Sequence, residues 1–367
     1  PAFRYGWTLL LVTQTGGMAA VAVTFAKYFA QLTNLPDTDQ ASAIIAVVTL
    51  AALTLVNCLG VRAGSAVQSA LMVLKIVAIA ALIACGLFVA QPAALPTEIA
   101  YTDDWRPAAG YFAPGMDWRT LTAFGAALVP VMFAYGGWQT SCFIAGEVRE
   151  PRKTLPRGLL IGVLGVIALY MLANYVYVHV LGIDLLTQTK TPASEVMRIA
   201  FGERGKAFIA TGIAVSTLGF LSQGMLTAPR VYFAMADDGL FFKRVAWLHP
   251  RTRVPAVAIA LQGALAILII VALSGVYAKI LNYVMSVDTV FFAVSAGCLF
   301  VFRRRDGRAA FRVPLHPLTT LVFIIAEGFV ALSVMVNYPI DSVKGWGILL
   351  AGIPVYFFWR RKQHERD

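Results

Sequence analysis

Four ionisable side chains lie inside long apolar stretches of this sequence: Lys27, Lys75, Asp288 and Glu327. A charge at the centre of a membrane-spanning helix costs about 2.5–3.5 kcal/mol on insertion scales, so each of these side chains needs a partner or a task. Lys27 lies near the end of its stretch, and its flexible stem lets the ammonium group reach the membrane surface. The other three side chains are therefore the candidates for chemistry inside a membrane.

Lys75 is the strongest candidate, because it lies deep inside the apolar run 66–90. A lysine at that depth is suited to exchange a proton during a transport cycle, and we predict a coupling role for it. The alternative is a structural ammonium group bonded to backbone carbonyls. Asp288 is a second candidate coupling residue, or else a cap or polar anchor. Glu327 is read as an interhelical hydrogen-bonding group.

A different signal lies in the fourth apolar run, where Pro130 is followed by the pair Gly136-Gly137. Proline removes a helical hydrogen bond and glycine weakens a helix, so this spacing predicts a break near mid-membrane. A broken helix frees backbone N–H and C=O groups, which transporters use to bind substrates and ions. The alternative is a simple kink with glycines for close helix packing.

The elements that must position these residues are predicted by composition. The 367 residues are 59% hydrophobic and only 13% charged, with a mean hydropathy of +0.73, which is typical of an integral membrane protein. Ten apolar runs are long enough to span a bilayer. They cover residues 5–33, 41–61, 66–90, 120–147, 157–182, 206–235, 255–274, 279–302, 315–337 and 343–359.

The net charge of +11 follows the predicted topology. Ten spans place twenty of the thirty Lys and Arg residues on the face that holds both chain ends, and eight on the opposite face. The positive-inside rule then predicts that both ends are cytoplasmic. The excess of basic residues is thereby explained without a nucleic acid partner.

Catalytic and metal-binding patterns are missing from the sequence. The four histidines, His179, His249, His316 and His364, are scattered, and the four cysteines have no paired spacing. No HExxH pair or Ser-His-Asp set is found. We therefore expect no enzyme activity, no metal and no cofactor.

Several motifs in series resemble the amino acid–polyamine–organocation superfamily of transporters. The stretch from Gly136-Gly137-Trp138 to Pro156-Arg157 is similar to the signature of its sixth helix. The stretches 230–241 and 249–255 resemble the end of its eighth helix and the start of its ninth. Residues 57–62 with the Lys75 run resemble its fourth-to-fifth region, and residues 5–16 resemble its third helix.

The resemblance implies an all-α inverted-repeat (5+5)+2 transporter fold with ten of the twelve helices present. The first run matches the third helix of the family, and the chain opens on Pro1, so we expect an N-terminally incomplete protein. A ten-helix variant is the alternative. The chain is then a single transmembrane domain, 1–367. Its expected parts are the rest of the first repeat (1–90), an external loop (91–119), the second repeat (120–302) and two C-terminal helices with a cytoplasmic tail (303–367).

Carried over residue by residue, the resemblance implies an aromatic gate at Phe133 above the substrate. It implies that Ala134, Tyr135, Gly136, Gly137 and Trp138 form an unwound segment that contacts the substrate backbone, with Gln139 directly after it. It also implies a roomier side of the pocket at Gly224. Gln139 stands where the arginine/agmatine antiporter branch of the family has a glutamate that senses protons. Because a glutamine side chain cannot titrate, the resemblance disfavours an acid-resistance exchanger. The resemblance also implies that Lys75 occupies the place of a sodium ion.

We therefore predict a secondary active amino acid transporter that works by alternating access and is coupled to protons. Neutral amino acids are the expected substrates, because the predicted break carries no carboxylate. The alternatives are a cationic amino acid or polyamine transporter or antiporter, and a non-transporting fragment of such a protein. A multi-pass location in the plasma or inner membrane, contact with the lipid bilayer and a homodimer complete the expectation.

Overall fold

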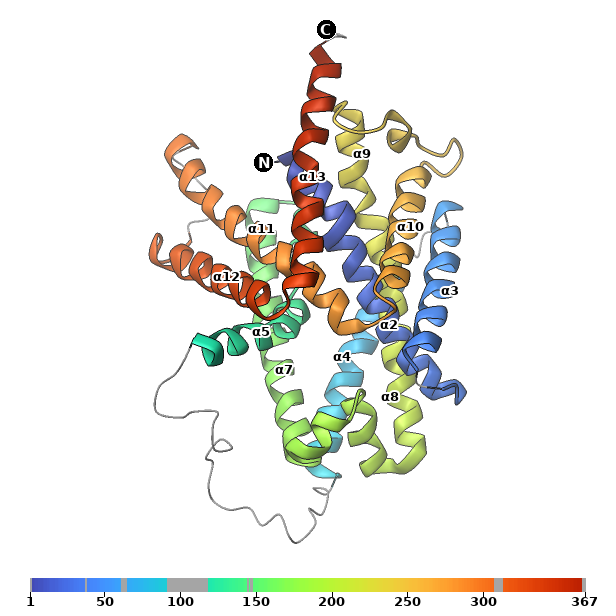
Figure 1. Ribbon diagram of the computed structural model, residues 1–367. Helices are drawn as coiled ribbons and strands as arrows, with labels where there is room; N and C mark the ends of the chain where they lie inside the picture. Colours follow the sequence, from blue (N-terminus) through green and yellow to red (C-terminus); the bar gives the residue numbers. More distant parts are fainter. Residues whose placement is uncertain are drawn as a thin grey trace.

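The computed structural model describes residues 2–36, 38–60, 65–90, 118–143, 145, 148–306 and 313–364, and the regular elements among these residues are all helices (Figure 1). This agrees with the predicted all-α class. Most of the helices stand roughly side by side, while α5, α11 and α12 lean together to one side. In chain order the elements are α1 (Ala2–Thr8), η1 (Leu9–Thr13), α2 (Gln14–Thr33), α3 (Asp39–Cys58), α4 (Ser65–Phe88), α5 (Trp118–Ala134), α6 (Thr140–Phe143), α7 (Pro151–Gln188), α8 (Pro192–Thr227), α9 (Pro229–Asp237), η3 (Lys243–Ala246), α10 (Ala256–Ala272), α11 (Tyr277–Asp306), α12 (Leu318–Asn337) and α13 (Pro339–His364).

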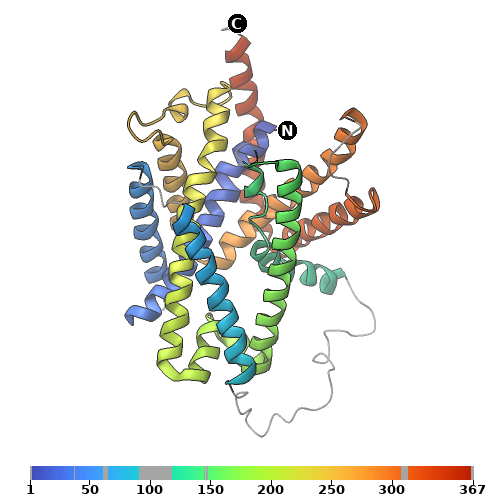
Figure 2. The same cartoon turned by 180° about the vertical axis from the view of Figure 1, so that it is seen from behind.

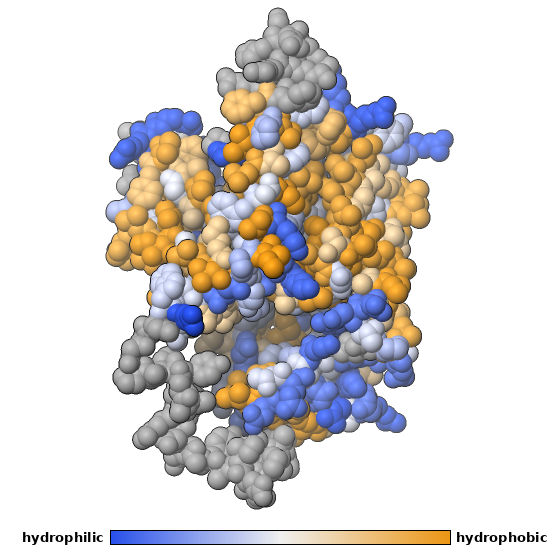
Figure 3. Space-filling model, in the orientation of Figure 1, coloured by the Kyte–Doolittle hydropathy of each residue, from blue (hydrophilic) through white to orange (hydrophobic). Residues whose placement is uncertain are grey.

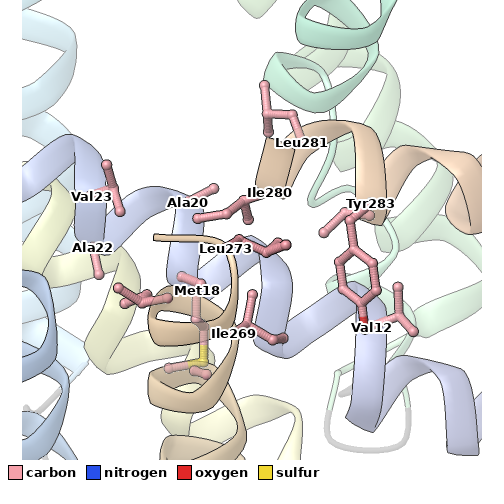
Figure 4. Packing of buried hydrophobic residues seen from close by; sticks show 14 of the residues in the cluster. Val12, Met18, Ala20, Ala22, Val23, Ile269, Leu273, Ile280, Leu281 and Tyr283 are labelled. Carbon is pink, nitrogen blue, oxygen red and sulfur yellow. The ribbon is translucent and has the colours of Figure 1, made fainter. Parts of the chain in front are cut away.

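Helix α2 forms the centre of the molecule, packed against α3, α8, α10 and α11. Its inner positions are small, and this lets the neighbouring backbones approach closely. Gly16 is the tightest of these positions, because a Cβ atom there would overlap the side chain of Val284. Figure 4 shows Met18 beside Ile269 and the ring of Tyr283 directed toward Val12 in this core.

The short π-helix η1 joins α1 to α2 and changes the hydrogen bonding of the backbone there. The Tyr283 hydroxyl donates to the carbonyl oxygen of Leu11 at 2.9 Å, and the Tyr232 hydroxyl to that of Leu9 at 3.5 Å. A π-helical turn shifts the ladder by one residue and is found mostly at functional sites. Thr13, the last residue of this turn, is buried beside α11.

A second core lies where α4 and α7 meet α8, on the side seen in Figure 2. Gly86 of α4 lies so close to Val176 of α7 that a Cβ atom would overlap that side chain. Both α7 and α8 contain non-helical residues near their shared end, at Gly182 and at Phe201–Gly202. Residues 192–200 lie between the predicted spans 157–182 and 206–235, and the structure shows that they are helical. Glycine tolerates the positive φ of residue 202, which lets the chain turn from this segment into the rest of α8.

Seven of the described helices are long and apolar enough to cross a membrane, and α5 and α10 are shorter apolar helices. Figure 3 shows apolar side chains forming a broad band on this face, with hydrophilic residues above and below it. The chain is therefore a multi-pass membrane protein. The count of ten spans stays a prediction, and most of the expected external loop (91–117) lies outside the described residues. Trp118 and Arg119, expected at the end of that loop, belong to α5.

Candidate functional site

The predicted break is present between α5 and the four-residue helix α6. Helix α5 passes through Pro130 and ends at Ala134, so the glycines and not the proline mark its end. Gly137 has φ of +98°, a backbone conformation that side chains with a Cβ atom rarely adopt. The sequence pattern therefore located the break correctly, while the proline only precedes it by one turn.

Two polar side chains shape the backbone of the break. The side-chain oxygen of Gln139 accepts a hydrogen bond from the Gly137 N–H at 2.9 Å. The Thr140 hydroxyl donates to the Gly137 carbonyl oxygen at 2.7 Å. The N–H groups of Trp138 and Gln139 have no hydrogen-bond partner among the described residues. Within the described ranges, the break thus presents two adjacent donors without an acceptor.

The end of α5 adds a partial charge of the opposite sign. The last carbonyl groups of a helix carry about half a negative charge, which favours a cation. Free N–H donors at Trp138 and Gln139 lie next to this end and favour an anion. A small zwitterion that carries an ammonium and a carboxylate group matches both features.

Aromatic rings surround the break from three helices. The ring of Phe133 lies near Gly17 of α2, where an added Cβ atom would be 3.9 Å from it. The rings of Tyr135 and Tyr170 are 5.2 Å apart, and the Tyr170 hydroxyl donates to the Ala134 carbonyl oxygen at 3.2 Å. These contacts hold the end of α5 against α2 and α7.

A second ring pair reaches α11. The rings of Trp138 and Phe292 are 5.3 Å apart, and Trp138 keeps 41% of its surface exposed. Phe292 itself is buried. Trp138 is therefore anchored on one edge and open on the other, as a side chain that contacts a ligand requires.

Lys75 lies elsewhere, on α4 where this helix packs against α8. It lines a hollow of about 320 Å³ together with Ser216 and Gln223 of α8. Lys75 makes no ion pair with any described residue, and its side chain is exposed at the hollow. The contacts of the described residues do not join Lys75 to the break or to Asp288.

Asp288 lies on the buried part of α11 and keeps 8% of its surface exposed. It interacts with the side chain of Thr13 and, electrostatically, with Glu327 of α12. Glu327 is 1% exposed, and its Oε2 atom has no hydrogen-bond partner in the described structure. The expected interhelical hydrogen bond of Glu327 is thus not seen at this oxygen.

Gly224 lies in the packed centre between α8, α2 and α10. A Cβ atom there would approach Nε2 of Gln14 to 3.2 Å, so little space remains on that side. The buried Gln262 of α10 donates a hydrogen bond to the Gly224 carbonyl oxygen at 3.2 Å. No contact among the described residues joins Gly224 to the break.

Sequence reasoning did not identify Tyr170, Phe292 and Gln262. Tyr170 and Phe292 are aromatic residues in apolar helices, and nothing in their local pattern separates them from lipid-facing or core residues. Gln262 carried a signal, because a polar side chain inside the run 255–274 needs a hydrogen-bond partner. Within the described ranges, no group of three His, Cys, Asp or Glu side chains is placed to hold a metal ion.

The fold and the site together define a multi-pass, all-α membrane protein with a broken apolar helix, whose backbone donors at the break have no partner among the described residues. Broken helices of this kind are a feature of secondary transporters. The family model described as amino acid permease matches residues 1–359, and the chain belongs to this family. The family consists of transporters and not of enzymes.

Three relatives illustrate the range of the family. The chain is 27% identical over 366 residues to the serine/threonine exchanger SteT of Bacillus subtilis, covering 98% of this chain and 79% of that protein. It is 26% identical to the large neutral amino acids transporter small subunit 2 of Homo sapiens, covering 97% of this chain and 65% of that protein. It is also 26% identical to the b(0,+)-type amino acid transporter 1 of Mus musculus, covering 98% of this chain and 71% of that protein. The chain thus spans between about two thirds and four fifths of the relatives it matches.

Proposed function

We propose that this protein is a secondary active amino acid transporter that works by alternating access, with neutral amino acids as its substrates. The observation that carries the proposal is the break after Ala134, where the free N–H groups of Trp138 and Gln139 lie next to the C-terminal end of α5. An amino acid carries one group for each of these features, a carboxylate for the donors and an ammonium for the helix end.

The residues proposed to form the substrate site lie on the break and on α8. Phe133 acts as the gate, because its ring lies between the end of α5 and Gly17 of α2. Gly224 acts from the side of α8, at a distance from the break. The full set is Phe133, Ala134, Tyr135, Gly136, Gly137, Trp138, Gln139 and Gly224.

A cationic amino acid or a polyamine is the second candidate substrate. Two of the relatives, SteT and the large neutral amino acids transporter, are named for neutral substrates. The break segment itself offers no carboxylate to a second positive charge, since residues 133–139 contain no Asp or Glu. This favours a neutral side chain.

Lys75 and Asp288 are the proposed coupling residues. Lys75 has no ion-pair partner in the described part of the chain and lines a hollow with Ser216 and Gln223, as expected for a group that gives up a proton during the cycle. We place the protein in the plasma or inner membrane as a homodimer with both ends cytoplasmic. The two ends lie toward the same side of the molecule in Figure 1, which supports the even number of spans.

Uptake into proteoliposomes tests the proposal. The purified protein should take up labelled serine, threonine or leucine against a panel of unlabelled competitors. Neutral amino acids should compete, whereas lysine and putrescine should not. Competition by lysine or putrescine alone would favour the second candidate. Uptake of no amino acid under any gradient would contradict the proposed function and support a non-transporting chain.

A further inference from the structure

The helices α5, α11 and α12 form a unit at the side of the molecule, seen from both directions in Figures 1 and 2. This unit contains two buried carboxyl side chains, Asp288 on α11 and Glu327 on α12. The register of the three helices decides whether these side chains meet.

The register of α12 against α5 is fixed by two contacts. The Asn337 side chain donates to the Thr122 carbonyl oxygen at 3.1 Å, and a Cβ atom at Gly125 would overlap the Ser333 side chain. The two helices are therefore antiparallel, and both rise by the same amount per residue. Six residues back from Ser333 lies Glu327, which is thus level with Val131, one turn before the break.

The register of α12 against α11 follows from the hairpin that joins them. The ring of Phe300 lies 4.9 Å from that of His316, and the Arg303 side chain donates to the Val313 carbonyl oxygen at 3.4 Å. Twelve residues back from Phe300 lies Asp288, and eleven residues on from His316 lies Glu327. Helix α12 begins at Leu318, nine residues before Glu327, so the hairpin brings the two carboxyl side chains to a similar level on two packed helices.

The surroundings of this pair supply few groups that would satisfy two negative charges. Thr13 interacts with Asp288, while Oε2 of Glu327 is buried with no partner among the described residues. Two buried carboxylates on packed helices repel each other because little water screens their charges, and a single shared proton removes the repulsion. Oε2 of Glu327, which is buried and has no partner in the described structure, is the atom on which we place such a proton.

The elements α2, α11 and α13 carry further titratable groups at Tyr28, Tyr277, Tyr283, Cys298 and Tyr356. Tyr5 of α1 lies close enough to interact with Asp288 and with Cys142 of α6. On α13, Lys344 pairs with Asp341 at 3.9 Å. The remaining charged residues lie toward the ends of α1, α2, α5, α11 and α13, namely Arg4, Lys27, Arg119, Lys279, Arg303, Arg304, Arg305, Asp306, Arg360, Arg361 and Lys362.

We propose that Asp288 and Glu327 together bind one proton, and that this proton keeps α11 and α12 packed against the broken helix. The link to the break is direct, because Phe292, one turn along α11 from Asp288, holds the ring of Trp138. Loss of the proton at alkaline pH places two negative charges at the level of Val131, loosens the Trp138 contact and weakens amino acid binding. The pair thus sets the pH range of the proposed substrate site, and this regulatory role rests on the proposed function.

Infrared spectroscopy tests the proton directly and needs no transport. The purified protein should show the carbonyl stretch of a buried, protonated carboxyl group at neutral pH, and the band should disappear as pH rises. Glu327→Gln and Asp288→Asn should each remove it, whereas the exposed-site controls Glu203→Gln and Asp184→Asn should keep it. A spectrum of the parent protein without such a band at any pH overturns the proposal. A band that appears only when sodium is removed also overturns it, because the site is then a sodium site.

Binding of labelled serine or leucine to the same proteins tests the regulation. The affinity of the parent and of both controls should fall about tenfold or more between about pH 6 and about pH 9. Glu327→Gln carries no charge and should bind with the same affinity across this range. Equal pH dependence in Glu327→Gln and the parent overturns the regulatory role, whereas no binding by the parent at any pH would count against the proposed function and leave the infrared result standing.

Discussion

The rings of Trp138 and Phe292 lie 5.3 Å apart and join the broken helix to the buried segment of α11. Trp138 follows directly on Gly137, whose positive φ sets the direction of the chain at this point. Phe292 is one helical turn from Asp288. This ring contact therefore links α11 to the segment whose N–H groups have no acceptor among the described residues.

A double-mutant cycle measures this relationship. Trp138→Ala and Phe292→Ala should each weaken amino acid binding, and the double variant should lose less than the sum of the two. The expected coupling energy is about 0.5–1.5 kcal/mol, the range of an aromatic pair. The cycle Tyr175→Ala with Phe292→Ala serves as the control, because Tyr175 stacks on His179 away from the break. Additive effects of Trp138→Ala and Phe292→Ala would show that the ring contact carries no energy.

Removal of the Phe133 ring should affect trapping of the substrate more than its binding. The ring lies near Gly17 of α2, at the end of α5, and supplies no polar group. Phe133→Ala should release bound amino acid at least about tenfold faster while equilibrium affinity falls by a smaller factor. Filter-retention kinetics with a labelled amino acid separate the two quantities. Equal retention times in variant and parent would argue against a gate at Phe133.

Replacement of Lys75 should remove the effect of a proton gradient on uptake. The side chain lines the α4–α8 hollow and makes no ion pair within the described ranges, so its loss leaves no charge unpaired. Lys75→Ala should keep the thermal stability of the parent, since the position is exposed at the hollow, and should take up amino acids at the same rate with and without an inward proton gradient. Lys206→Ala, on α8 just after the kink at Gly202 and paired with Glu203 at 3.6 Å, is the control. Continued stimulation of Lys75→Ala by the gradient would remove Lys75 from the coupling mechanism.

Two neighbouring glycines on α2 offer a matched pair for stability. A Cβ atom at Gly16 would overlap Val284 of α11, whereas a Cβ atom at Gly17 meets only the Phe133 ring at an ordinary 3.9 Å. Gly16→Ala should lower the free energy of unfolding by about 1–3 kcal/mol through overpacking. Gly17→Ala should leave it unchanged or raise it slightly, because alanine favours the helix. Thermal unfolding in detergent compares the two, and equal melting temperatures would contradict the close packing of α2 against α11.

The sequence predicted the helices and the break because these features are local. Apolar runs and the Gly136-Gly137 pair determine where a helix forms and where it ends, whatever packs beside it. The partners of the break were not predictable in the same way. Phe292 and Tyr170 reach it from helices more than thirty residues away in the chain, and their residue types are common on any apolar helix.

Glu327 illustrates the same limit on the prediction of sites. Its sequence context is that of a single acidic residue in an apolar helix, for which an interhelical hydrogen bond is the usual function. Its relation to Asp288 depends on the register of α11, α12 and α5, which is set by contacts such as that of Gly125 with Ser333. A register between helices is a tertiary property that a single sequence does not reveal.

Equilibrium binding of a labelled neutral amino acid to three proteins tests whether the break forms the substrate site. The parent protein, Gly137→Ala and the control Gly158→Ala are compared. A Cβ atom finds open space at both glycines, but only Gly137 has a positive φ, so alanine strains the backbone of the break alone. The account predicts that the parent and Gly158→Ala bind with equal affinity and that Gly137→Ala binds about tenfold more weakly, which corresponds to about 1.4 kcal/mol. Equal affinity in all three proteins would contradict a substrate site at the break.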